Sequence, residues 1–167
     1  MWRHTVLACT LVSGILTGRA SAETPILFPF VEGDTQFAVR RAAEGAADRL
    51  ARHACQGLFD HFTTPSGQRL STVLAAKGKS PAEAFGLLRF ADESAAPQCR
   101  TGHTLAFTHV GSPLIRVCGL QFRDRFAWDR RTAEVILIHE FLHALGLGEN
   151  PPTSSEITKQ VAARCAQ

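Results

Sequence analysis

The chain contains 167 residues, with 18 lysines and arginines against 15 aspartates and glutamates, and its formal net charge at pH 7 is +3. Two of the basic residues, Arg3 and Arg19, lie in a segment that we expect to be removed, and without them the net charge falls from +3 to +1. A balance this close to neutral does not indicate nucleic-acid binding. Four arginines gather between residues 123 and 131, but two aspartates lie among them, which is typical of a solvated loop face.

The first 22 residues have the pattern of a signal peptide. Arg3 provides a basic start, residues 6–18 form an apolar run, and the small residues 20–22 precede a predicted cleavage after Ala22. Cleavage as a lipoprotein before Cys9 is the alternative, but it would leave an apolar stretch too short to engage the export machinery. We therefore expect a secreted or periplasmic protein.

The mature chain, residues 23–167, has the size of one domain. Removing 22 of the 167 residues leaves 145, which is enough for one hydrophobic core and too few for two comfortable domains. No later segment approaches the roughly 18 continuous apolar residues that a membrane helix needs, so we expect no membrane span and a soluble mature chain.

The cysteines of the mature chain form an even set: Cys55, Cys99, Cys118 and Cys165. Because exported proteins mature in an oxidising compartment, this set predicts two disulfides. The spacing leaves all three pairings open. A zinc site made of these cysteines is the alternative, but none has another cysteine two to four residues away, as such sites usually require.

Helices are predicted over most of the first half of the mature chain. Residues 34–61 are rich in alanine, arginine and leucine and contain no proline, which predicts one long helix, or two with a kink near Gly45 or Gly57. A second helix is predicted over residues 68–76. Ser80-Pro81-Ala82-Glu83 combines an N-cap serine, a proline at the first helical position and a capping-box glutamate, so a third, short helix is expected there.

Strands are predicted in the second half of the chain. Residues 104–108 and 114–118 are separated by Gly111-Ser112-Pro113, which indicates a β-hairpin or two adjacent strands. Asp129 can cap the next helix, which carries residues 135–138 and is apolar nearly all round, as expected of a buried central helix. The order of the elements favours an α+β fold with helices packed on a small sheet.

The end of that central helix carries the sequence HEFLHALGLGEN. Because His139 and His143 are four residues apart, their β-carbons lie roughly 6 Å apart on one helix face and both imidazoles can bind one metal ion. Glu140 lies about 100° around the helix, where it can take a proton from water that the metal activates. Gly146 falls where a helix that ends in a left-handed turn requires glycine, and Glu149 lies just beyond that turn, within reach of the ion.

This stretch resembles the HExxH signature of the zincin metallopeptidases, and more closely the extended form of the metzincin branch, HExxHxxGxx followed by histidine or aspartate. His139, Glu140, His143 and Gly146 match that form position by position, and Glu149 occupies the place of the third ligand with a longer carboxylate. The resemblance implies a Zn²⁺ cofactor held by His139, His143 and Glu149, with Glu140 as the catalytic base. It also implies a small zincin-like domain in which N-terminal helices pack with a small sheet and a buried active-site helix.

The chain departs from the metzincin pattern in several places. Its only methionine is Met1, so it has no methionine turn, and it contains no tyrosine to stabilise a transition state. Only 18 residues follow Glu149, too few for the family's lower subdomain. Glu156 is an alternative third ligand, as in the gluzincin branch, although the capping-box spacing from Thr153 to Glu156 explains that glutamate without a metal.

The other histidines of the mature chain have weaker indications of function. His53 and His61 are eight residues apart in the first helical region and are expected at or near the surface. His103 and His109 flank the predicted strand that borders the cleft in zincins, so either can donate a hydrogen bond to a developing oxyanion. The sequence does not choose between them.

The sequence therefore predicts a secreted zinc metallopeptidase that hydrolyses a peptide or protein substrate. The first alternative is a non-catalytic exported domain that keeps the zincin scaffold for binding or inhibition. The second is a zinc amidase acting on a non-peptide amide, such as a cell-wall bond, because that reaction would use the same site chemistry.

Overall fold

The computed structural model describes residues 27–167. The predicted signal peptide, residues 1–22 with cleavage after Ala22, and the alternative cleavage before Cys9 lie outside these residues. Within residues 27–167, no helix is both long enough and apolar enough to cross a lipid bilayer.

Four short strands form one mixed sheet in the order β1-β2-β4-β3. Strands β1 (Leu27–Phe30), β2 (Arg89–Asp92) and β4 (Leu114–Val117) are parallel to one another, and β3 (Ala106–Phe107) pairs antiparallel with β4 at the edge. The two predicted strands are confirmed as β3 and β4, shorter than expected. Strands β1 and β2 were not predicted.

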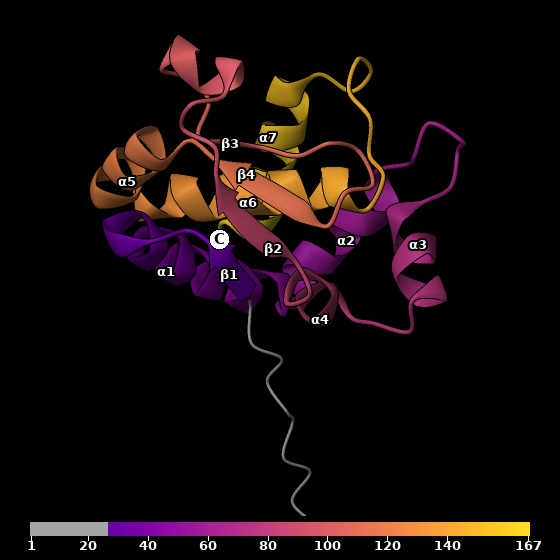
Figure 1. The fold of residues 1–167 in the computed structure, drawn as a ribbon. Coiled ribbons are helices and arrows are strands. Elements are labelled where there is room, and N and C mark those ends of the chain that lie inside the picture. The colour runs from indigo at the N-terminus through magenta and orange to yellow at the C-terminus, as the bar shows by residue number, and fades with distance from the viewer. Residues whose placement is uncertain (1–26) are drawn as a thin grey trace, which may run out of the picture.

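Residues 27–167 form seven α-helices and one short 3-10 turn in addition to the sheet, which confirms the predicted α+β class. In chain order they are α1 (Gly33–Leu50), α2 (His53–His61), α3 (Leu70–Ala76), α4 (Pro81–Phe85), η1 (Pro97–Thr101), α5 (Gly119–Trp128), α6 (Arg130–Ala144) and α7 (Ser154–Cys165). Figure 1 shows α6 and α7 behind the sheet, with α5 at one end of the molecule and α2 and α3 at the other. Helix α6 contacts α1, α5, α7, β3 and β4, so the predicted buried central helix is confirmed.

The predicted kink at a glycine is wrong. The chain breaks instead at Ala51 and Arg52, between α1 and α2, and both Gly45 and Gly57 lie inside helices. Gly45 has a packing role, because a β-carbon built there would lie 2.2 Å from Oε1 of the buried Glu134 on α6. The small residue therefore allows α1 and α6 to approach closely.

Where α1 and α6 meet, the buried carboxylate of Glu134 binds two arginines. Its Oε2 accepts a hydrogen bond from Arg49 Nε at 2.6 Å, and its Oε1 accepts one from Arg130 Nε at 3.0 Å. Arg49 Nη1 also donates to the Cys165 carbonyl at 3.1 Å, which ties the end of α7 to α1. Each carboxylate oxygen of Glu134 thus has a charged donor, which offsets much of the cost of burying it.

The predicted helix caps and disulfides are confirmed. Ser80 and Glu83 form a capping box at α4, and Asp129 accepts the backbone N–H of Thr132 at the start of α6. The cysteines pair as Cys55–Cys165, which joins α2 to the end of α7, and as Cys99–Cys118, which joins η1 to the start of α5.

Apolar side chains of α6 pack in the core. The ring of Phe141, the third residue of HEFLH, makes edge contacts with Phe59 at 5.9 Å and with Phe85 at 5.5 Å between centroids. Phe85 in turn contacts Phe90 of β2 at 6.4 Å. Because this cluster fixes one side of α6, it also fixes the direction in which the motif histidines point.

Alanine substitutions at the two helical glycines should have opposite effects. Gly45→Ala should lower the free energy of unfolding by about 1–3 kcal/mol, because the new methyl group would displace Glu134 from its arginines. Gly57→Ala is the matched control, since no atom lies within 4 Å of a β-carbon there. It should raise the free energy of unfolding by about 0.5–1 kcal/mol through helix propensity. Urea denaturation of both variants measures the difference, and equal effects would contradict the close packing at Gly45.

Candidate metal centre

Helix α6 ends in a Schellman motif, which confirms the glycine turn predicted from the sequence. Gly146 has a φ of +108°, a conformation that favours glycine. The N–H of Gly146 donates to the His143 carbonyl at 2.9 Å, and the N–H of Leu147 donates to the Leu142 carbonyl at 3.0 Å. These are the paired hydrogen bonds that define the motif. The chain therefore reverses directly after His143.

The same turn fixes the imidazole of His143. Nδ1 of His143 lies 2.8 Å from the Leu147 carbonyl oxygen. A carbonyl only accepts hydrogen bonds, so the proton of the neutral ring is on Nδ1 and the lone pair is on Nε2. The His143 carbonyl also accepts the N–H of Gly111 at 2.8 Å, which ties the β3–β4 turn to this end of α6.

Helix α7 orients the second imidazole. Nδ1 of His139 lies 2.9 Å from Oγ1 of Thr158. Burial, and then the charge of His143, lowers the pKa of His139 to about 3, so its ring is neutral at physiological pH. In the tautomer whose Nδ1–H donates to Thr158, His139 presents the lone pair of Nε2 to His143.

Three potential ligand atoms converge beyond the two rings. The Nε2 atoms of His139 and His143 are 3.0 Å apart. Oε1 of Glu149 lies 3.3 Å from Nε2 of His143 and 3.7 Å from Nε2 of His139. The histidines are buried, whereas the Glu149 side chain is 40% exposed. Because two lone pairs and a carboxylate oxygen can all be satisfied at once by a cation, these three residues can hold a metal ion.

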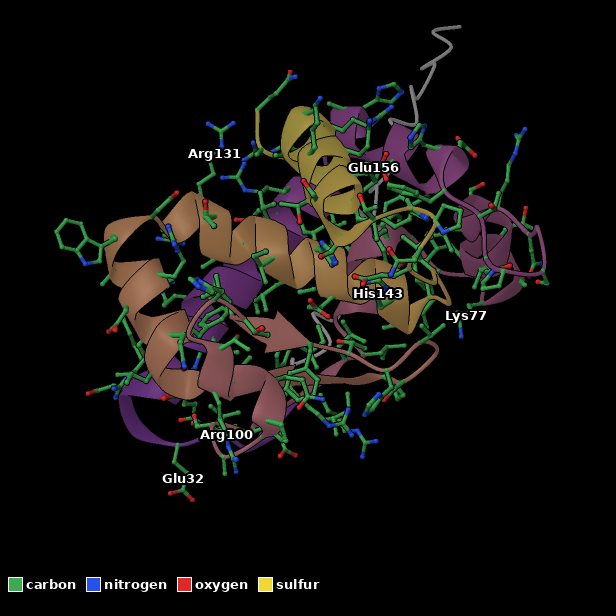
Figure 2. The ribbon with its side chains drawn as sticks, turned by 90° about the horizontal axis from the view of Figure 1, so that it is seen from above. Glu32, Lys77, Arg100, Arg131, His143 and Glu156 are labelled. Atoms are coloured by element: carbon green, nitrogen blue, oxygen red, sulfur yellow. A yellow bond between two sulfur atoms is a disulfide. The ribbon has the colours of Figure 1, made fainter. Side chains whose placement is uncertain are left out.

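Glu156, the alternative third ligand, forms a helix cap instead. Its Oε2 accepts hydrogen bonds from the backbone N–H and the hydroxyl of Thr153, both at 2.8 Å. These hydrogen bonds, that of the backbone first, hold the pKa of Glu156 below its usual value. Figure 2 shows His143 near the C-terminal end of α6 and Glu156 on the neighbouring α7. The geometry brings Glu149, and not Glu156, to the two histidines.

Glu140 is buried beside the ligand set. It is 6% exposed, and its Oε2 has no hydrogen-bond partner among residues 27–167. Burial, together with a smaller effect of the Glu149 charge, raises the pKa of Glu140 to about 8, although the nearby hydroxyl and N–H of Thr108 oppose the shift. The hydroxyl contact does not have the geometry of a full hydrogen bond, because Thr108 Oγ1 is also buried without a partner among the described residues. A buried carboxylate oxygen left unpaired is costly, which favours a role in binding a ligand group.

Two cavities border the centre, and we name them the Glu149 cavity and the Glu140 cavity. The Glu149 cavity has a volume of about 710 Å³ and includes His61, Thr64, Pro65 and Gln160 in its lining. The Glu140 cavity has a volume of about 400 Å³ and is lined by His139 and Glu140 together with residues of β3, of the segment before it, of α5 and of α7: His103, Leu105, Ala106, Arg125 and Ser154. Of the two histidines that flank β3, His103 therefore lies in the cavity with Glu140, and His109 lines neither cavity.

Several residues around the site were not found by reasoning from the sequence. Thr158 and Thr108 carry no motif, and their places depend on how α7 and β3 pack against α6. The arginines between residues 123 and 131 were assigned to a loop face, but they lie on α5 and on the first turn of α6. Arg125 lines the Glu140 cavity. His53 and His61 are exposed, as expected, although His61 lines the Glu149 cavity.

Comparison of the chain with protein-family models, with curated proteins and with solved structures found no match. The assignment of a function therefore depends on the geometry and chemistry of the site.

We expect metal binding to require Glu149 but not Glu156. Titration of the metal-free protein with Co²⁺, followed by visible absorption, should give one site per chain, and Glu149→Ala should weaken binding because it removes a ligand. Glu156→Ala should bind Co²⁺ like the parent, but its free energy of unfolding should be lower because the capping box is lost. A Glu156→Ala variant that loses the metal while Glu149→Ala keeps it would reverse the ligand assignment.

The buried carboxyl of Glu140 should make the stability of the metal-free protein depend on pH. A carboxyl whose pKa is raised to about 8 in the folded state binds its proton more tightly there than in the unfolded chain. The contribution of Glu140 to stability should therefore fall as the pH rises from roughly 4.5 to 8. Glu140→Gln should remove this loss, so its advantage over the parent should grow across that window, to the order of several kcal/mol. Urea denaturation at a series of pH values in a chelator tests this, and a difference independent of pH would refute it.

Proposed function

We propose that the protein is a zinc-dependent metallopeptidase of the zincin type. The spacing of the three ligand atoms carries the proposal. A tetrahedral Zn²⁺ with bonds of roughly 2.0–2.1 Å separates its ligand atoms by about 3.3–3.4 Å. The separations among Nε2 of His139, Nε2 of His143 and Oε1 of Glu149 are 3.0, 3.3 and 3.7 Å, which bracket that value.

The donor set supports the same metal. Two imidazole nitrogens and one carboxylate oxygen suit Zn²⁺ and leave a fourth position open, as in catalytic zinc sites. Nδ1 of each histidine forms a hydrogen bond: that of His139 with the Thr158 hydroxyl, and that of His143 with the Leu147 carbonyl. Such partners orient metal-binding histidines and fix their tautomers.

We assign the general base to Glu140. When bound, zinc would polarise the scissile carbonyl and allow water to act as a nucleophile at neutral pH. Glu140 has an unpaired Oε2 and shares a cavity with His139, so it can accept the proton of the attacking water and deliver it to the leaving amine. Burial raises the pKa of Glu140, but a divalent cation beside the carboxyl favours its ionised form.

His103 is the side chain to which we assign stabilisation of the developing oxyanion. It shares the cavity with Glu140, and the chain contains no tyrosine for this task. An N–H donor aimed at the oxyanion acts most strongly in a site that excludes water.

We further propose that the protein acts outside the cytoplasm. Two disulfides join Cys55 to Cys165 and Cys99 to Cys118, and structural disulfides persist in oxidising compartments. A cell-wall amide would meet the same site chemistry as a peptide, so substrate panels should contain both.

Replacement of the base should separate turnover from metal binding. Glu140→Gln keeps the shape of the side chain but cannot accept a proton, so kcat on a cleaved peptide should fall by about 10³- to 10⁴-fold while zinc stays bound. His143→Ala should lose both, because it removes a ligand. Peptide-library digestion followed by mass spectrometry, with elemental analysis of each variant, gives both measurements.

Glu44→Gln is the matched control, since Glu44 is exposed on α1 and pairs only with Arg41 among the described residues. It should cleave like the parent. If Glu140→Gln is as fast as the parent, the mechanism is wrong. If the parent holds zinc and cleaves neither peptides nor cell-wall amides, the non-catalytic binding domain becomes the better interpretation.

A further inference from the structure

The two cavities at the metal centre differ in charge. The Glu149 cavity contains two carboxylates, those of Glu149 and Glu156, and no lysine or arginine. The Glu140 cavity is lined by Arg125, and Glu140 is the only acidic residue in its lining. A substrate that spans the centre therefore meets an acidic side and a side that carries an arginine.

Arg125 is free to bind a ligand. Two neighbouring arginines have carboxylate partners, since Arg123 lies 4.0 Å from Asp34 and Arg130 lies 3.0 Å from Glu134. Among residues 27–167, the guanidinium of Arg125 makes no hydrogen bond or ion pair. Its positive charge contributes only a small part of the lowering of the Asp129 pKa. An arginine that lines a cavity without a partner retains its full set of donors for a carboxylate.

The charge balance of the complete site favours an anion there. With the zinc that we propose, the two positive charges of the ion are matched by Glu140 and Glu149, so Arg125 leaves the Glu140 cavity positive. Ser154, the first residue of α7, also lines this cavity and adds a hydroxyl donor. A volume of about 400 Å³ is sufficient for an amino-acid side chain.

We propose that the Glu140 cavity binds a carboxylate of the substrate through Arg125, so that the protein selects peptides with a negative charge on one side of the scissile bond. The carboxylate belongs either to an aspartate or glutamate side chain or to the C-terminus of the peptide. This inference rests on the proposed peptidase function, because it names the substrate class of that same site.

The test compares matched peptides cleaved by the zinc-loaded protein. Each peptide of a neutral, alanine-rich series carries one aspartate, or one asparagine as its control, at successive positions on either side of the cleaved bond, with an amidated C-terminus. A second series carries a free C-terminal carboxylate at the same positions. We expect aspartate or the free carboxylate to raise kcat/KM by about 10- to 100-fold on one side only, mainly through KM.

Substitution of Arg125 shows which residue carries the preference. Arg125→Met should abolish the preference, so that the variant cleaves the aspartate and asparagine peptides with kcat/KM values within about twofold of each other. A zinc content equal to that of the parent shows that the variant is folded. Arg131→Met is the matched control, because it removes the same charge near Asp129 but lines neither cavity. Figure 2 shows Arg131 at the other end of α6 from His143. Arg131→Met should keep the preference.

A binding measurement separates failure of this inference from failure of the proposed function. Calorimetric titration of the zinc-loaded Glu140→Gln protein with the aspartate and asparagine peptides reports the subsite without turnover. If peptides are cleaved with no acidic preference, or if Arg125→Met keeps it, the carboxylate subsite is wrong and the peptidase remains. If nothing is cleaved but the aspartate peptide binds more tightly in a manner that needs Arg125, the subsite stands and the peptidase function falls. Absence of both cleavage and binding overturns both.

Discussion

The burial of three polar side chains on one helix is the constraint on which this structure depends. His139, Glu140 and His143 have exposed fractions of 3%, 6% and 5% on α6, the helix that contacts α1, α5, α7, β3 and β4. Removing such groups from water costs several kcal/mol in total unless protein groups or a cation replace the water. The elements around α6 provide those partners: Thr158 on α7 binds one imidazole, and the Leu147 carbonyl binds the other. The geometry of the site therefore depends on the elements that pack against α6.

The packing of α7 against α6 depends on contacts far from the site. Thr158 reaches His139 only if α7 keeps its register on α6, and that register is set at the opposite end of α7. There the Cys55–Cys165 disulfide joins α7 to α2, and Arg49 donates to the Cys165 carbonyl while it also binds Glu134. An ion pair at the start of α6 and a disulfide at the end of α7 thus constrain the imidazole at the centre.

Features that depend on neighbouring residues could be predicted from the sequence, and features that depend on distant partners could not. The capping box at Ser80, the turn at Gly146 and the spacing of HEFLH follow from residues a few positions apart, and all three are present. Strand β2 has only four residues and is stabilised by pairing with β1 and β4, so its own sequence does not clearly predict a strand. The Thr158 contact joins residues 19 positions apart on two helices. The expected kink at Gly45 failed for the same reason, because that glycine is needed for packing against Glu134.

Two glutamates on α6 differ in how far the fold provides hydrogen-bond partners for a buried carboxylate. Glu134 and Glu140 are buried to nearly the same extent, at 5% and 6% exposure. Both oxygens of Glu134 accept a hydrogen bond from an arginine, and Gly45 closes the space above them, so this carboxylate can accept little more. Oε2 of Glu140 has no partner among the described residues and belongs to a side chain that lines a cavity. Because the fold satisfies one buried carboxylate completely and leaves the next unpaired near the two imidazoles, the second is the one that can accept a ligand group.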